Sequence, residues 1–261
     1  MSTPYLPPEI LDYILETLHD DHKTLRNCCV AAKSWISRTR KHLFADIKFS
    51  SSEDLELWKK TFPDPSNSPA CHTHTLSVKF PQVIAGEDAD DGSWIRTFSC
   101  VVRFDVDTRI PYLNDSKVSL SPFHGLSPVL KSLRVTSTKL PYSQIIRLIY
   151  SLPLLEDLAL VIFGPINDDD LHVDGTPAAI QPPSSPSFTG TLRLVLFQGM
   201  GPAVRRLLDL PNGLHFRKLT ISLSKGDDVQ WITALVVECL DTLESLSVSR
   251  PPFGTVVWLP R

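Results

Sequence analysis

The chain has 261 residues, of which 42% are hydrophobic and 21% charged, and its formal net charge is −3. This composition is typical of one or two globular domains and excludes a chain that is disordered throughout. No basic patch is interleaved with aromatic residues, which argues against nucleic acid as a partner. No apolar run approaches the 18 residues of a membrane helix, and acidic residues precede any signal core. We therefore expect a cytoplasmic or nuclear protein that has no membrane partner.

The cysteines indicate a reducing compartment. They are odd in number and scattered, and the adjacent Cys28 and Cys29 could not form an ordinary disulfide. The others are Cys71, Cys100 and Cys239. We expect no disulfide framework.

Three short helices are predicted at the N-terminus. Pro7 and Pro8 suit a first helical turn, where Glu9 lies near the positive end of the helix dipole. A second helix is predicted from about Lys23, and a third carries Trp35. Without a disulfide or a metal motif these helices form too small a core to stand alone, so we expect a partner to cover part of their apolar surface. The apolar residues of the first helix lie on one stripe: Ile10, Leu11, Ile14, Leu15 and Leu18.

The ordered set of residues over about 5–45 resembles an F-box, the three-helix module that binds a Skp-type adaptor in cullin-based ubiquitin ligases. The resemblance is carried by Leu6-Pro7-x-Glu9-Ile10, Ile14-Leu15, Leu18, Leu25, Val30-Ala31-Ala32, Ser34-Trp35 and Leu43-Phe44. It implies a module over residues 1–48, in which Leu11, Leu15 and Leu18 are shared between the adaptor interface and the core. The alternative is an ordinary helical cap of a larger domain. The implied adaptor-binding residues are Leu6, Pro7, Ile10, Ile14, Leu25, Val30 and Trp35.

After a predicted linker over 49–70, short apolar-x-apolar pairs recur along the chain. Their first members are 28, 29, 25, 36, 25 and 27 residues apart. Periods of this length are typical of repeats, and leucine-rich repeats run about 20 to 29 residues. Between the pairs, the apolar spacing in 143–152 and 228–239 predicts short helices. The pairs are Leu76 and Val78, Phe104 and Val106, Leu133 and Val135, Leu158 and Leu160, Leu194 and Leu196, Leu219 and Ile221, and Leu246 and Val248.

These segments resemble degenerate leucine-rich repeats of the kind often found after an F-box. The predicted repeat domain covers residues 71–250. The expected fold class is α/β: an N-terminal three-helix F-box followed by an irregular leucine-rich-repeat solenoid with a parallel sheet. An irregular α/β domain with strands at similar spacing is the alternative. The Asn ladder of standard repeats is missing, because Ser137, Ile162, Gln198 and Ser224 occupy its places.

The longest interval between pairs contains a segment rich in proline, serine and aspartate. A loop inserted over 164–187 is therefore predicted. Ser185-Pro186 is the obvious phosphorylation site in it, although a plain solvated insertion explains the same composition. Residues 251–261 are expected to form a C-terminal tail or cap.

Motifs for catalysis, cofactors and metals are incomplete. Gly199-Met200-Gly201 follows a strand, but Val204 stands where a dinucleotide loop needs its third glycine. The segments 19–22 and 71–74 hold His, Asp and Cys without the paired spacing of a structural zinc site. Ser127 lies in a sequence that lacks the final glycine of a nucleophile elbow. We expect no catalytic residue, no cofactor and no metal.

Strand alternation predicts which repeat residues could meet a target. The predicted function is that of a non-catalytic substrate receptor of a Skp/cullin/F-box-type E3 ubiquitin ligase, which holds a target protein near the ubiquitin-transferring subunits. Its partners would be a Skp-type adaptor, through it a cullin, and a target that the sequence does not name. The alternative is a stand-alone repeat scaffold capped by the N-terminal helices. The candidate target-binding residues are Arg134, Asp157, Arg193, Phe197 and Lys218.

Overall fold

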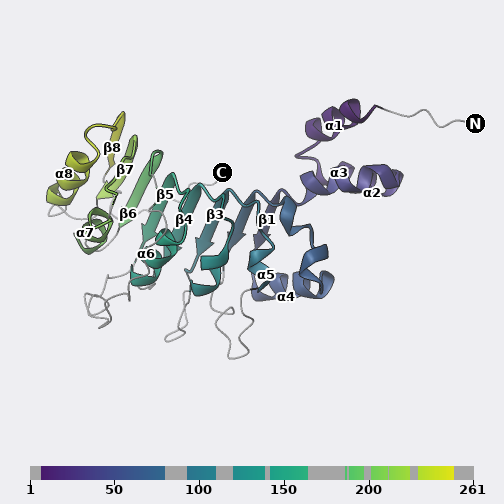
Figure 1. Cartoon of the computed structure of the whole chain (residues 1–261), viewed down its shortest axis with the longest axis horizontal. Helices are drawn as coiled ribbons and strands as arrows, with labels where there is room; N and C mark the ends of the chain where they lie inside the picture. Colours follow the sequence, from purple (N-terminus) through teal and green to yellow (C-terminus); the bar gives the residue numbers. More distant parts are fainter. Residues whose placement is uncertain are drawn as a thin grey trace, which may run out of the picture.

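The structure is a computed structural model that describes residues 7–79, 93–109, 120–138, 142–163, 186, 188–196, 201–210, 212–223 and 229–249. They form a mixed α/β fold around one eight-stranded parallel sheet, in which neighbouring strands follow chain order (Figure 1). Parallel neighbours require a crossover after every strand. The strands are β1 (Asp46–Phe49), β2 (Thr75–Val78), β3 (Arg103–Asp107), β4 (Ser132–Ser137), β5 (Asp157–Ile162), β6 (Thr191–Leu196), β7 (Lys218–Leu223) and β8 (Ser245–Ser249).

The apolar-x-apolar pairs form the inner face of this sheet. The first apolar positions align across it in register, from Leu76 in β2 to Leu246 in β8. The alignment is wrong in β6, where Leu192 and not Leu194 pairs with Leu158 and Leu219. Because strand side chains alternate with a period of two, an error of two residues leaves the predicted faces unchanged.

The segment predicted as a linker, 49–70, differs in the structure. β1 begins just before it and pairs in register with β2, so Ile47 aligns with Leu76. The helix α4 (Ser52–Thr61) follows, with a capping box in which Ser51 accepts from the backbone N–H of Asp54. Leu55 of α4 is buried in the main core. The segment is therefore part of the sheet domain.

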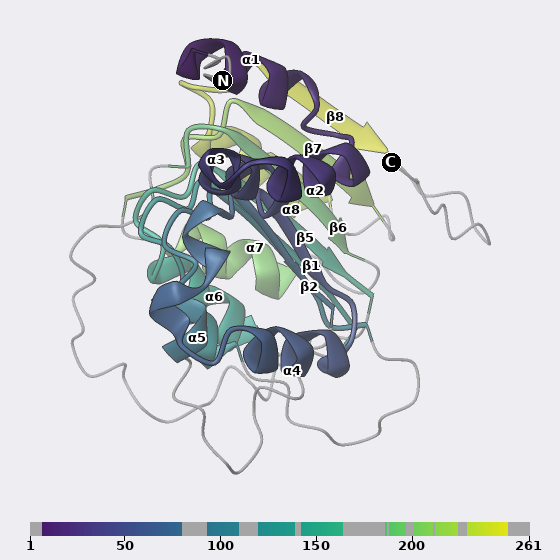
Figure 2. The same ribbon diagram turned by 90° about the vertical axis from the view of Figure 1, so that its right-hand side faces the viewer.

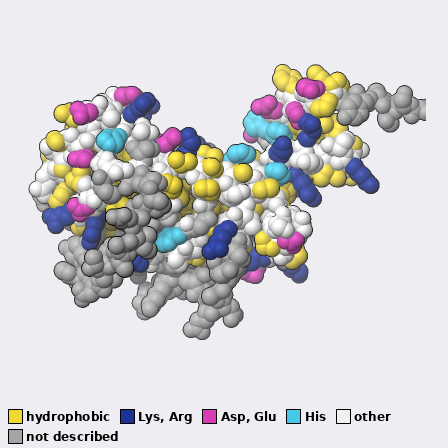
Figure 3. Space-filling view, viewed as in Figure 1, with side chains coloured by type: hydrophobic (Ala, Val, Ile, Leu, Met, Phe, Trp, Pro, Cys, Tyr) yellow, Lys and Arg dark blue, Asp and Glu magenta, His cyan; other side chains and the backbone are white. Residues whose placement is uncertain are grey.

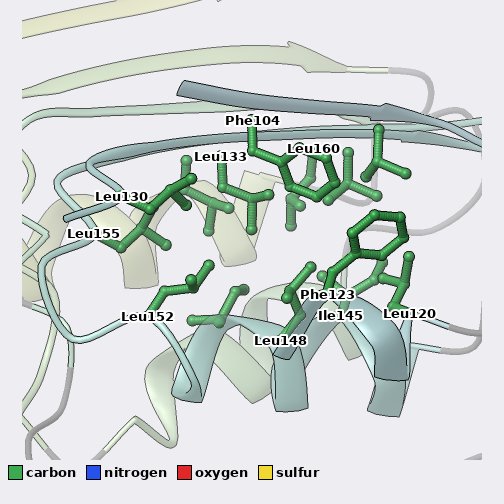
Figure 4. Packing of buried hydrophobic residues seen from close by; sticks show 14 of the residues in the cluster. Phe104, Leu120, Phe123, Leu130, Leu133, Ile145, Leu148, Leu152, Leu155 and Leu160 are labelled. Atoms are coloured by element: carbon green, nitrogen blue, oxygen red, sulfur yellow. The ribbon is translucent and has the colours of Figure 1, made fainter. Parts of the chain in front are cut away.

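Helices cover one face of the sheet, as the end-on view shows (Figure 2). Close up, Ile145 and Leu148 of α6 lie opposite Phe104, Leu133 and Leu160 of the strands (Figure 4). In the part of the chain that the structure describes, the other face, here called the outer face, carries no helix. The elements on the helical side after α4 are η1 (Pro65–Asn67), η2 (Pro69–His72), α5 (Ser93–Arg96), η4 (Ser121–Gly125), α6 (Tyr142–Tyr150), α7 (Gly201–Leu208) and α8 (Val229–Glu238).

The three predicted N-terminal helices are present and have a small core of their own. They are α1 (Pro8–Thr17), α2 (His22–Ala31) and α3 (Lys33–Leu43), called here the helical module. Its core consists of Leu11, Leu15 and Leu25, with Leu18, Cys28, Trp35 and Leu43 partly buried around them.

Polar contacts stabilise the helical module internally, and one aromatic residue joins it to the sheet domain. The Asp21 side chain caps α2 by accepting from the backbone N–H of Thr24 at 3.0 Å. An ion pair between Asp12 and Arg38 joins α1 to α3. Phe44, just after α3, meets Trp58 edge-on with ring centroids 6.0 Å apart. The helical module is thus attached next to β1, beyond the edge of the sheet (Figure 1).

Several predictions lie outside the described residues. They concern Leu6, Phe197, the positions Gln198 and Ser224 where standard repeats have asparagine, the inserted loop 164–187 apart from Pro186, and the tail 251–261.

Candidate functional site

The first candidate surface is the exposed side of α1 and α2. Ile10 is 49% exposed and Val30 is 88% exposed, and Pro7 is also exposed. Tyr13, which sequence reasoning missed, is 71% exposed. It lies three residues after Ile10, so its helical spacing could have revealed it. In the space-filling view, hydrophobic atoms cover much of the helical module (Figure 3).

Three predicted adaptor-binding residues lie deeper in the helical module. Leu25 is 0% exposed and belongs to the core. Its contact with an adaptor stays a prediction. Ile14 is half-buried, and Trp35 packs partly against the same core. Of the residues assumed to be shared, Leu11 and Leu15 are fully in the core and Leu18 is partly buried.

The second candidate surface is the outer face of the sheet. At one register position a row of side chains crosses all eight strands and is called here the outer row. Arg134 and Arg193 lie in this row on either side of Ala159. Two strand spacings separate them, about 9.6 Å between Cα atoms. The outer row is Lys48, Ser77, Asp105, Arg134, Ala159, Arg193, Thr220 and Ser247.

The outer face carries three of the predicted target-binding cations. Arg134, Arg193 and Lys218 are all exposed, and Lys218 lies on the strand next to Arg193. Among the residues that the structure describes, these three form no ion pair. Asp105 precedes Arg134 in the outer row. The small side chain of Ala159 leaves space between the two arginines, which could converge on one anionic group.

Asp157, a predicted target-binding residue, also has a structural role. Its Oδ1 accepts from the backbone N–H of Thr191 at 2.6 Å and so holds the start of β6 against β5. A Cβ added at Gly190 would collide with this carboxylate. The carboxylate is thus partly used inside the fold.

The residues considered for catalysis have structural surroundings. Ser127 is buried, and its Oγ donates to the carbonyl of Ser99 at 2.7 Å. Burial raises the pKa of Tyr142 and of the Cys239 thiol. Burial, then Lys41 and Arg40, lower the pKa of His72. Burial is the largest cause of each of these pKa shifts.

The structure also contains a small hollow beside α4 and α5. Its volume is about 200 Å³, and its lining holds no His, Cys, Asp or Glu. The lining residues are Trp58, Lys59, Phe62, Pro63, Pro65, Ser68, Trp94 and Thr97. Within the described ranges, no group of three or more His, Cys, Asp or Glu side chains could hold a metal ion. None of the helices in those ranges is long and apolar enough to cross a membrane.

Comparison with known proteins adds no assignment: the chain matches no model of a protein family, and no curated protein matches it in sequence.

Proposed function

We propose that the protein is a non-catalytic substrate receptor of a Skp/cullin/F-box-type ubiquitin ligase. The observation that carries this proposal is the helical module, which has its own small core and exposes Ile10, Tyr13 and Val30. Large apolar side chains at this density on so small a unit favour a docking surface. Ile10 and Val30 are among the residues that carry the F-box resemblance of residues 5–45.

Covering the exposed side chains would favour docking. Ile10, Tyr13 and Val30 would contribute up to about 1.5 to 3 kcal/mol each, and Ile10 less, because it is already half-buried. The loss of translational and rotational freedom opposes this gain, so only the surplus appears as affinity. Because the core of the helical module is separate from that of the sheet domain, an adaptor could bind without rearranging the sheet.

The outer face is the proposed target surface. Arg134, Arg193 and Lys218 are exposed there without ion-pair partners among the described residues. Guanidinium groups bind carboxylates with two parallel hydrogen bonds. We therefore infer that the target presents an acidic segment to the arginines on either side of Ala159.

The mechanism is proximity. With the adaptor and cullin bound at the helical module and the target at the sheet, the target has a high effective concentration near the subunits that transfer ubiquitin. The receptor itself would need no catalytic group, cofactor or metal. It would act in the cytoplasm or the nucleus.

Calorimetric titration of the full chain with a purified Skp-type adaptor tests the proposal. The double variant Ile10→Asp/Val30→Asp places two charges on the docking surface and should abolish measurable binding. Leu57→Asp is the matched control, because Leu57 of α4 is 64% exposed and lies outside the helical module. The control should bind like the unaltered chain. If the unaltered chain does not bind the adaptor, the stand-alone scaffold becomes the better account.

A second titration tests the target surface. The probe is a labelled polyglutamate peptide, and fluorescence anisotropy measures its binding to the chain. The variant Arg134→Ala/Arg193→Ala should weaken binding of the peptide. Lys48→Ala is the control, because it removes a charge from the same outer row, four strands from Ala159, and it should have little effect. Equal losses in both variants would mean that only the overall charge matters.

A further inference from the structure

A second group of exposed apolar side chains lies at the far end of the sheet from the helical module. Five large hydrophobic residues of α8, the turn that follows it and β8 are 46–67% exposed. On the inner face, Leu246 and Val248 of β8 are each 46% exposed, whereas the equivalent residues of β1 to β7 are at most 9% exposed. The five are Val229, Val237, Leu240, Leu246 and Val248.

One side of the helix α8 is also exposed at this end of the molecule. Leu235 points into the main core, and Gly201 of α7 lies against Trp231 of α8. Val237 and Leu240 therefore remain on a side that neither the core nor α7 covers. In Figure 1, α8 and β8 are the last elements at this end, which we call the end face.

Among the residues that the structure describes, no strand pairs with the outer edge of β8, and β8 itself carries none of the usual protection of an edge strand. Proteins commonly protect edge strands with lysine, proline or a bulge, but β8 reads Ser-Leu-Ser-Val-Ser. The backbone N–H of Ser245 donates to the carbonyl of Arg217 beside β7. Because backbone groups alternate in direction along a strand, those of Leu246 and Val248 point away from β7. The residues that expose apolar side chains thus also carry the free backbone groups.

We propose that the end face binds a second copy of this chain through antiparallel pairing of the two β8 strands. A two-fold axis at Ser247 places Leu246 opposite Val248 of the partner subunit, and Val248 opposite the partner's Leu246. Both positions are hydrogen-bonded pairs in this register, because their backbone groups point to the free edge. Such an isologous contact uses one surface on both subunits and closes at a dimer.

The area of the end face suits this occupant. A two-fold axis perpendicular to the sheet keeps the helices of both copies on the same side, so α8 packs against its own copy. The five apolar side chains are 46–67% exposed, and together with the edge of β8 they would bury about 500 Å² per copy, half of the roughly 1,000 Å² that a specific interface needs. Because this total is at the lower limit of specific interfaces, we expect a weak, reversible dimer.

Sedimentation equilibrium of the full chain at tens of micromolar tests this proposal. We expect a monomer–dimer equilibrium, and we expect Leu246→Glu/Val248→Glu to raise the dissociation constant by about 100-fold or more. Leu57→Glu is the matched control, because Leu57 is an exposed leucine of α4, away from the end face. A monomeric unaltered chain overturns the proposal, as does a dimer that Leu246→Glu/Val248→Glu leaves intact.

Cysteine cross-linking tests the register. In the proposed dimer Ser247 faces its own copy in a non-hydrogen-bonded pair, about 4.5 Å between Cα atoms, which a disulfide can span. Ser247→Cys should therefore cross-link under mild oxidation, whereas Ser249→Cys should not. Cross-linking of both variants or of neither would contradict this pairing. The helical module takes no part in the dimer, so adaptor binding and dimerisation can each fail independently.

Discussion

Replacing Leu25 by alanine tests the assignment of this residue to the core of the helical module. Leu25 is 0% exposed and is one of only three fully buried side chains in that core. Its truncation removes three carbon groups at about 0.8 kcal/mol each, and the remaining cavity raises the cost to about 3 to 4 kcal/mol. Val30→Ala should change stability by less than about 0.5 kcal/mol, because Val30 is exposed.

Hydrogen exchange measures this cost locally. Since the two cores are separate, Leu25→Ala should speed exchange of amides in α1 to α3 by about 100-fold or more, unless unfolding already limits them. The amides of the central strands should keep their protection. Unchanged exchange in α2, or equal losses of protection in both cores, would contradict the placement of Leu25 in a separate core.

Three further predictions concern single sites. Gly190→Ala should destabilise the chain by about 1 to 3 kcal/mol in urea unfolding, because the added Cβ meets the Asp157 carboxylate. In an Asp157→Ala background, the same substitution should cost less. The Thr24 hydroxyl and backbone N–H hold the pKa of the Asp21 carboxyl below its ordinary 3.8. The stability that this cap contributes is therefore present above pH 3.8 and is lost as the pH falls through the lower pKa of the folded state. An NMR titration of Asp21 should show a midpoint below 3.8. Added salt should weaken polyglutamate binding by the unaltered chain, and much less so in Arg134→Ala/Arg193→Ala.

The strand positions were largely predictable because each strand must bury an apolar pair against the helices. The prediction missed β1, although Ile47 and Phe49 have the same pattern 29 residues before Leu76 and Val78. It also chose the wrong pair in β6, because Leu192, Leu194 and Leu196 all alternate correctly. Only the pairing with neighbouring strands distinguishes between them.

The candidate surfaces were predictable in part. Alternation correctly placed Arg134 and Arg193 on the same face, since it depends only on local strand geometry. The apolar stripe of α1 could not be divided from sequence, because only the packing of the three helices decides that Leu11 is buried and Ile10 exposed. The same reason explains Leu25, whose burial depends on how α2 packs against α1.

Hydrogen exchange of the full chain, measured with and without a Skp-type adaptor, is the sharpest test of the proposed docking surface. The adaptor should slow exchange in the helical module, most strongly in α1 and α2 around Ile10 and Val30, while the strands and α8 exchange as before. Absence of any protection, or protection confined to the outer face of the sheet, would contradict it.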